Sequence, residues 1–192
     1  MRIVGIGGST REESSTEVLI RAVLDASEEL GAKTRLFPGK ALVLPPYEPR
    51  RPLPRRATTL LDAVRDADAV VFGSPGYHGT VSGFVKNALD YLEDLREDDP
   101  PYIDGRAVGC IAIASGWQAT VSTLMSLRSV VHALRGWPTP MGAALNAVGG
   151  LFDENGTCLD QSATFQLELL GRQVVEFARM SSAGAATAGV GS

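Results

Sequence analysis

Short apolar runs alternate with amphipathic stretches along the 192 residues of this chain. The apolar runs predict strands over residues 2–6, 34–37, 67–75, 106–115 and 140–145. Apolar positions at helical spacing predict helices over residues 16–30, 58–65, 83–95, 120–134 and 162–179. Gly31 follows the first helix where a residue in the left-handed conformation commonly ends one. Ser82 stands where a side chain can cap the third helix.

This alternation of strands and helices predicts an α/β fold. Because each strand is mostly apolar, the pattern indicates a parallel sheet of five strands that is covered by helices on both faces. We expect one domain over residues 1–180. The last residues, 181–192, are small and polar, and we predict that they form a disordered tail.

Composition and charge exclude several classes of protein. Hydrophobic residues make up 44% and charged residues 21%, as in a globular protein, and the net charge of −4 gives no reason to expect nucleic acid as a partner. No apolar run approaches the length that spans a bilayer, so we expect no membrane association. Cys110 and Cys158 are far apart and indicate neither a disulfide framework nor a zinc site. We therefore expect a cytoplasmic protein.

In a parallel α/β sheet, ligands bind at the carboxyl ends of the strands. The loop after the first strand, GGSTREESST, opens a helix, whose N-terminus favours an anion. It lacks the last glycine of the dinucleotide fingerprint, because Thr10 stands there, and no lysine precedes Lys33 to complete a Walker loop. Hydroxyl groups of Ser9, Ser14, Ser15 and Thr16, together with the Arg11 guanidinium, suit a phosphate monoester. An ordinary capped helix with a solvated Arg11 is the alternative.

The loops after the third and fourth strands are also rich in glycine and hydroxyl groups. Pro75, Gly76 and Gly79 predict a tight turn, in which Tyr77 and His78 could flank a flat heterocycle. Trp117 follows Ser115 and Gly116, where its indole could cover a ring or fill the edge of the sheet. A plain strand-to-helix turn explains either loop alone, but not the chemistry that all three loops share.

Together these loops resemble one known family. GGSTREESST is similar to the G-S-x-R-x-x-S-x-N/T loop of the NADPH-dependent FMN reductases, and SPGYHGTVSGFVKNALDYL is similar to their S-P-E-Y-N-G-S-x-x-G-x-L-K-N-A-L-D-W-L segment. The resemblance covers residues 2–179. It implies a flavodoxin-like, doubly wound sheet with strand order 2-1-3-4-5 and noncovalently bound FMN.

Carried over by position, the resemblance assigns the FMN phosphate to Ser9, Arg11, Ser14, Ser15 and Thr16. It assigns the isoalloxazine ring to Pro75, Gly76, Tyr77, His78 and Gly79 on one side and to Ser115, Gly116 and Trp117 on the other. This chain departs from the family pattern where Gly76 replaces an acidic residue and where His78 replaces an asparagine. It also departs in the loop after the fourth strand, where SGWQAT has one glycine and a tryptophan in place of a glycine-rich S-x-G-x-x-G-G or T-G-G sequence.

The resemblance implies an NAD(P)H-dependent FMN reductase. Its cofactors would be FMN with NADPH or NADH, and its acceptor a quinone, an azo compound or a flavin-dependent monooxygenase. The flavin carries the redox chemistry in such enzymes, so no catalytic side chain is expected. The alternative is an FMN-binding electron-transfer module that does not itself oxidise NAD(P)H.

Two further segments carry hypotheses. Four arginines surround two prolines in RRPLPRR, residues 50–56, which could contact the 2′-phosphate of NADPH or another anion, or form a solvated linker. Apolar residues surround more of the helix at 83–95 than one buried face needs. We therefore expect a homodimer or homotetramer with this helix in its interface, as the family resemblance also implies, and we expect Lys86 and Asp90 to pair on it.

Overall fold

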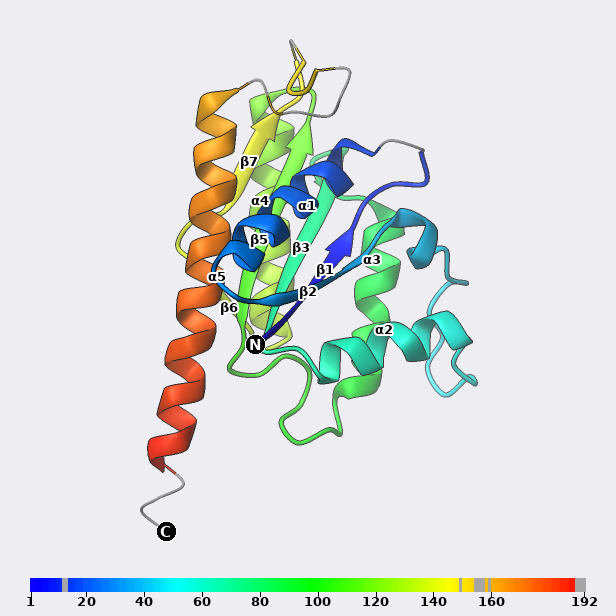
Figure 1. Cartoon of the computed structure of the whole chain (residues 1–192). Helices are drawn as coiled ribbons and strands as arrows, with labels where there is room; N and C mark the ends of the chain where they lie inside the picture. Colours follow the sequence, from blue (N-terminus) through cyan, green and yellow to red (C-terminus); the bar gives the residue numbers. More distant parts are fainter. Residues whose placement is uncertain (12–13, 149, 154–157, 159, 189–192) are drawn as a thin grey trace.

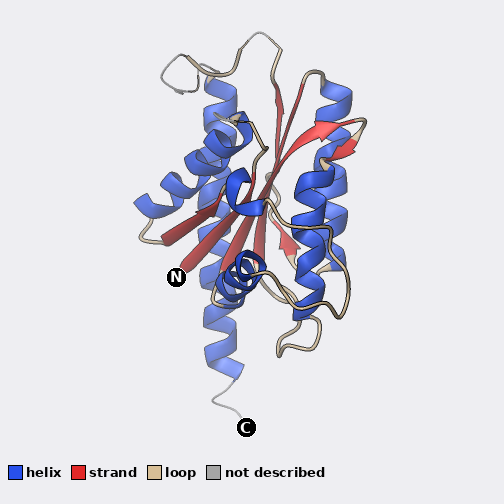
Figure 2. Cartoon of the chain, turned by 90° about the vertical axis from the view of Figure 1, so that its right-hand side faces the viewer, coloured by secondary structure: helices blue, strands red, loops and turns tan. Residues whose placement is uncertain are grey.

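A computed structural model describes residues 1–11, 14–148, 150–153, 158 and 160–188. A largely parallel β-sheet forms the middle layer, and helices cover both of its faces (Figures 1 and 2). The strands are β1 (Arg2–Gly7), β2 (Lys33–Phe37), β3 (Ala69–Tyr77), β4 (Thr80–Val81), β5 (Ala107–Ala114), β6 (Trp137–Pro138) and β7 (Ala143–Asn146). The helices are α1 (Ser15–Glu29), α2 (Arg55–Arg65), α3 (Gly83–Asp90), α4 (Trp117–Ala133) and α5 (Gln161–Ala188). Two short 3₁₀ helices, η1 (Gly39–Leu42) and η2 (Tyr91–Leu95), complete the order.

The sheet has the predicted doubly wound arrangement, but it has more strands than predicted. The order is β2-β1-β3-β5-β6, and β7 also pairs with β5. The fifth position of the sheet is thus shared by two short strands, β6 beside the start of β5 and β7 beside its end. The predicted strand at 140–145 overlaps β7 alone, and β6 was not predicted. Pro138 and Pro140 lie at the break between them, and a proline has no backbone N–H to donate to the ladder. The remaining extra strand, β4, pairs antiparallel with β3.

Two hydrophobic cores hold the layers together. On one face, α1 and α5 pack against the sheet through residues such as Ile20, Leu24 and Leu170, which are fully buried. On the other face, α2, α3 and α4 enclose Phe72, Leu61 and neighbouring apolar residues. No helix among the described residues is long and apolar enough to cross a membrane.

The sequence-based reason for placing an oligomer interface on the helix at 83–95 is wrong. Leu89, Tyr91 and Leu92 are at most 3% exposed within the single chain. The long loop that precedes α2 covers this helix, with the Tyr47 and Tyr91 rings 5.2 Å apart and with the Asn87 side chain accepting a hydrogen bond from the Tyr47 N–H at 2.8 Å. The helix also changes to the 3₁₀ form at η2. The expected pair between Lys86 and Asp90 is present.

The C-terminal helix is longer than predicted. It continues through Ala188, past the expected end at Arg179 and into the segment predicted to be disordered. Alanine favours the helix in this stretch, and the Ser181 hydroxyl donates to the Gly105 carbonyl oxygen at 3.2 Å. α5 therefore extends beyond the amino-terminal edge of the sheet (Figure 1). Residues 189–192 of the predicted tail lie outside the described residues.

The end of β1 is a point of close backbone packing. Gly7 has a φ of 152°, and a Cβ atom at this position would lie 2.0 Å from the carbonyl oxygen of Gly73 on β3. Gly31, after α1, also has a positive φ, of 87°, but no atom would lie within 4 Å of its Cβ. A side chain at Gly31 would therefore introduce backbone strain alone, whereas a side chain at Gly7 would introduce both backbone strain and a steric clash.

We predict that Gly7→Ala lowers the free energy of unfolding more than Gly31→Ala does. Each substitution places alanine at a positive φ, which costs about 1–3 kcal/mol. Gly7→Ala also forces the two strands apart, which adds about 1–3 kcal/mol. Urea unfolding followed by circular dichroism measures both. Equal losses would contradict the proposed close contact between β1 and β3.

Candidate active site

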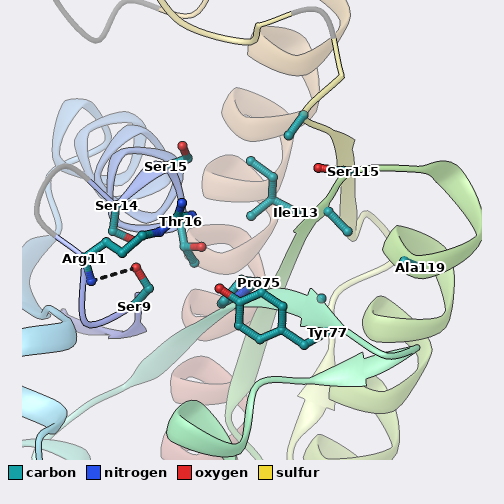
Figure 3. Close-up of a pocket in the computed structure, with 13 residues that line it drawn as sticks. Ser9, Arg11, Ser14, Ser15, Thr16, Pro75, Tyr77, Ile113, Ser115 and Ala119 are labelled. Carbon is teal, nitrogen blue, oxygen red and sulfur yellow. Dashed lines mark hydrogen bonds between the residues drawn. The ribbon is translucent and has the colours of Figure 1, made fainter.

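A cavity of about 300 Å³ opens at the carboxyl edge of the sheet. It is lined by Ser9, Arg11, Ser14, Ser15, Thr16, Pro75, Gly76, Tyr77, Ile113, Ala114, Ser115, Ala119 and Ala147. The first loop and the start of α1 form one wall, and Ser115 and Ala119 lie across from them (Figure 3). The Tyr77 ring and Pro75 lie between these walls (Figure 3). All three loops that were singled out in the sequence therefore contribute to one cavity.

The first loop presents hydrogen-bond donors at the N-terminus of α1. Ser14 is the N-cap residue and is extended, but its side chain does not cap the helix. Ser9, Ser14 and Thr16 are 8%, 4% and 2% exposed, so their hydroxyl groups lie in a largely buried environment. The Ser9 hydroxyl oxygen accepts a hydrogen bond from the backbone N–H of Arg11 at 3.3 Å, which folds the loop on itself.

The position of this loop is fixed by η1. The Glu17 carboxylate, in the first turn of α1, accepts a hydrogen bond from the Gly39 N–H at 2.8 Å. A Cβ atom at Gly39 would lie 1.9 Å from the Ser9 carbonyl oxygen, so the two backbones are in direct contact. The Glu17 carboxylate, in the first turn of α1, is thereby engaged in a structural bond.

The second loop is a β-hairpin. β3 continues to Tyr77, beyond its expected end at Pro75, and Tyr77 pairs with Thr80 of β4. The two residues between them, His78 and Gly79, have φ values of 52° and 85°. Two successive positive φ angles are typical of the type I′ hairpin turn, which favours asparagine before glycine, and histidine also tolerates this conformation. His78 and Gly79 are exposed and do not line the cavity.

Two buried serines hold this loop in place. The fully buried Ser74 hydroxyl donates to the Pro75 carbonyl oxygen at 2.8 Å and accepts from the Ser82 N–H at 3.0 Å. The Ser82 hydroxyl oxygen accepts from the Val85 N–H at 3.1 Å, which confirms Ser82 as the cap of α3. Both ends of the hairpin are thus tied to the start of α3.

Gly76 allows α4 to approach β3 closely. A Cβ atom at this position would lie 2.5 Å from the Thr123 hydroxyl oxygen and 3.1 Å from the Ala114 Cβ. The acidic side chain that the family pattern has here would require at least the Thr123 side chain to shift. The glycine of this chain is therefore matched to its own helix packing.

The third loop is held by a residue that sequence reasoning missed. The Asn146 side-chain oxygen, at the end of β7, accepts hydrogen bonds from the Gly116 N–H and the Val148 N–H, each at 3.0 Å. Gly116 has a φ of 130° and is the N-cap of α4. Trp117 begins that helix, is 63% exposed and does not line the cavity, and neither does Gly116. The rule that ligands bind at the carboxyl ends of parallel strands could have identified Asn146, because this residue ends β7.

The other residues that sequence reasoning missed are apolar. They are Ile113, Ala114, Ala119 and Ala147. Three of these lie at the carboxyl end of β5 or directly after β7, so the strand-end rule that found the polar loops applies to them as well. They give this side of the cavity the apolar surface that a flat ring requires.

The cavity offers hydrogen-bond donors and apolar surface, and neither cysteine of the chain lines it. Burial raises the pKa of the Cys110 thiol to about 12, so this thiol stays protonated in the folded protein at neutral pH. Among the described residues, no cluster of histidine, cysteine, aspartate and glutamate could hold a metal ion. The hydroxyl groups and Arg11 match the acceptor oxygens of a phosphate monoester, and the apolar side suits a planar ring.

Comparisons with known proteins point to one family. A family model described as NADPH-dependent FMN reductase matches residues 1–148. The chain is 35% identical over 127 residues to a protein of Staphylococcus saprophyticus named FMN-dependent NADPH-azoreductase, across 64% of this chain and 63% of that protein. It is 32% identical over 104 residues to an iron-sulfur flavoprotein of Methanocaldococcus jannaschii, across 50% and 54% of the two chains. The chain therefore spans less than two thirds of the length of either relative.

Solved structures give the fold class. The flavoenzyme FerB of Paracoccus denitrificans, an NAD(P)H:acceptor oxidoreductase, superposes with a TM-score of 0.74 at 17% identity, across 94% of this chain and 98% of that one. A WrbA-like flavodoxin of Agrobacterium tumefaciens superposes with a TM-score of 0.64 at 16% identity, across 94% and 98%. These likenesses confirm that the fold is flavodoxin-like. Since the family model matches residues 1–148 of 192, the chain belongs to the NADPH-dependent FMN reductase family.

Proposed function

We propose that this chain is an NAD(P)H-dependent FMN reductase that passes electrons to a small-molecule acceptor. The observation that carries the proposal is the cavity at the carboxyl edge of the sheet, with Arg11 and four hydroxyl groups at one end and apolar residues at the other. Bound FMN would supply the redox chemistry by accepting hydride from the nicotinamide and releasing electrons to the acceptor.

In this proposal the first loop holds the FMN phosphate. Ser9, Ser14, Ser15 and Thr16 donate hydroxyl hydrogen bonds to it, and Arg11 adds a charged fork. The N-terminus of α1 contributes its partial positive charge, because the side chain of its N-cap residue, Ser14, does not cap it. Buried serine and threonine hydroxyls that face a cavity are stabilised when a ligand accepts their hydrogen bonds.

The second and third loops would position the flat ring. Pro75, Gly76, Tyr77 and Ser115 line the cavity next to the apolar residues of β5. Tyr77 is 48% exposed, so its ring can cover one side of a bound flavin while leaving the opening free. We assign His78, Gly79, Gly116 and Trp117 to the rim, where the nicotinamide and the acceptor would enter.

The acceptor is proposed by class. The relative in Staphylococcus saprophyticus is named an azoreductase, which favours an azo compound, and a quinone offers a similar flat, reducible system. A flavin-dependent monooxygenase that receives reduced flavin is a further candidate partner. We place this activity in the cytoplasm, where nicotinamide cofactors are available.

We predict that Arg11→Ala weakens FMN binding about tenfold or more. A hydrogen bond to a charged group contributes about 1.5–3 kcal/mol, and the alanine variant loses both the charge and the bond. Flavin fluorescence titration of the apoprotein measures the affinity. The matched control is Arg21→Ala, which removes one exposed arginine from α1. An unchanged affinity in the Arg11 variant would overturn the assignment of the first loop.

We predict that the purified FMN-loaded protein oxidises NADPH faster when a quinone or an azo dye is added. Loss of nicotinamide absorbance and bleaching of the dye measure the two half-reactions separately. The electron-transfer module is the competing function. It is favoured if the protein binds FMN tightly, oxidises neither NADPH nor NADH, and still exchanges electrons with a chemical reductant.

We also propose a homodimer, or a homotetramer built from it, with α4 in the interface. Trp117, Val121 and Met125 are 63%, 51% and 58% exposed and follow one another at four-residue spacing along one face of α4. No ionisable residue lies between Trp117 and Leu127. A second α4 could therefore pack against this face across a two-fold axis without meeting a like charge.

We predict that Met125→Glu shifts the protein from dimer to monomer. The substitution places two like charges opposite each other in the proposed contact, and burying them there is unfavourable. Sedimentation equilibrium at micromolar protein measures the mass. Met180→Glu, at a residue that is 68% exposed on α5, is the control and should leave the dimer intact. A concentration-independent mass of 20.3 kDa for the parent chain would show that it is a monomer.

A further inference from the structure

A second cavity, of about 660 Å³, lies between the edge strand β2 and α2. Its charged lining residues are Arg35, Lys40, Arg55 and Arg56, and no carboxylate lines it. We call this cavity the cationic groove. Four cations in one groove are unusual for a chain whose net charge is −4, because like charges repel and an acidic chain has carboxylates available to pair with them.

Three of these cations form no ion pair with any residue that the structure describes. Within the described part of the chain, Arg35, Arg55 and Arg56 form no ion pair with a carboxylate. Four arginines outside the groove, Arg2, Arg51, Arg65 and Arg96, do form such pairs, as Arg65 does with Asp98 at 2.7 Å. These three arginines therefore keep their charged donors available for an incoming anion.

Arg55 and Arg56 are also placed where they weaken their own helix. They are the first two residues of α2, and no acidic residue stands in its first turn. The N-terminus of a helix carries partial positive charge, so cations there are unfavourable and carboxylates are preferred. Residues that break a local rule of this kind are expected at functional sites.

The protection of edge strands explains only part of this pattern. Cations on an edge strand prevent pairing with other sheets, and Arg35 lies on β2, at the edge (Figure 1). Arg55 and Arg56 lie on a helix, which has no edge to protect. Their presence in the groove therefore requires another reason.

The groove also has a surface for a planar group. The Arg35 guanidinium lies over the Phe37 ring, 4.6 Å from its centroid. Phe37 is 5% exposed, so its ring packs against one face of the Arg35 guanidinium. Arg35 is exposed and lines the groove, so the other face of its guanidinium can contact a ligand. Guanidinium groups stack on aromatic rings, and a purine base is such a ring. Leu36, Pro38 and Ala41 add apolar lining.

One backbone segment connects the cationic groove to the cavity at the carboxyl edge of the sheet, which we call the flavin cavity because the proposed function places FMN there. Pro38 and Lys40 line the groove, and Gly39 between them contacts Ser9, which lines the flavin cavity. A molecule that occupies the groove therefore lies next to the loop assigned to the FMN phosphate.

We propose that the cationic groove binds a phosphorylated nucleoside, with its base on the Arg35 guanidinium and its phosphate groups on Arg55, Arg56 and Lys40. Two sources offer this chemistry, namely the 2′-phosphoadenosine end of NADPH and a free nucleotide. Binding here does not depend on flavin reduction, so this proposal can fail while the proposed function holds, and the reverse is also possible.

The test uses the FMN-loaded full chain and 2′,5′-ADP as the probe. Calorimetric titration at low ionic strength should give saturable binding that weakens as salt is added. The double variant R55A/R56A should lose about tenfold or more in affinity for 2′,5′-ADP, because it loses two charge-assisted contacts. Alanine favours the helix at these exposed positions, so the variant should fold. R35A should weaken 2′,5′-ADP more than it weakens pyrophosphate, which has no base.

The matched control is R21A/R172A, which removes the same charge from exposed positions on α1 and α5, on the opposite face of the sheet. When it and R55A/R56A are compared at about 0.15 M salt, it should change the affinity by less than about twofold, since the Debye length is then about 8 Å and charges on the opposite face of the sheet are largely screened. The proposal is overturned if 2′,5′-ADP does not bind the parent chain. It is also overturned if R55A/R56A binds as the parent does, or if the control loses as much affinity as R55A/R56A.

Nicotinamide kinetics then identify the source. If the groove binds NADPH, R55A/R56A raises the KM for NADPH and leaves the KM for NADH unchanged, and 2′,5′-ADP competes with NADPH. If R55A/R56A loses 2′,5′-ADP binding while both KM values stay at the parent level, the groove binds a free nucleotide. Either result supports the groove as a nucleotide site.

Discussion

The site depends on how closely backbone segments pack where β1 and β3 leave the sheet. A Cβ atom at Gly7 would lie 2.0 Å from the Gly73 carbonyl oxygen, and one at Gly39 would lie 1.9 Å from that of Ser9. Only glycine leaves room for such contacts. Because the first loop turns at this point, its hydroxyl groups are held above the sheet edge, beside the second loop. The packing of two strands thereby sets the position of the proposed phosphate site.

Most of the fold and much of the cavity could be predicted from the sequence because both depend on local patterns. Strand and helix periodicity is local, and so are the turn signals, so the element order follows from the chain read in windows. The rule that ligands bind at the carboxyl ends of parallel strands then identifies the loops that contain Arg11, Tyr77 and Ser115, which do line one cavity. Ile113 and Ala147 were missed because an apolar residue at a strand end carries no chemical signature of its own.

The errors arise where distant segments meet. Nothing near α3 in the sequence indicates that Tyr47 covers Tyr91, or that the Asn87 side chain donates to the Pro45 carbonyl oxygen at 3.0 Å. The apolar residues around that helix are therefore buried by other segments of the same chain. Trp117 was expected beside the ring because it follows a glycine-rich loop, but that loop ends one residue earlier and Trp117 turns outward on α4. Similarly, the last helix gains a contact to Gly105 that its composition does not predict.

The distribution of charge links the two cavities. An FMN phosphate in the first loop and a nucleotide phosphate in the cationic groove would lie on either side of Gly39, and anions close together oppose each other's binding. Arg11 on one side and the arginines of the groove on the other would each offset one of these charges. The Glu17 carboxylate is bonded to the Gly39 N–H, at the boundary between them. Within the described residues, Arg35, Arg55 and Arg56 form no ion pair with a carboxylate, so their charges remain to offset a second phosphate beside this segment.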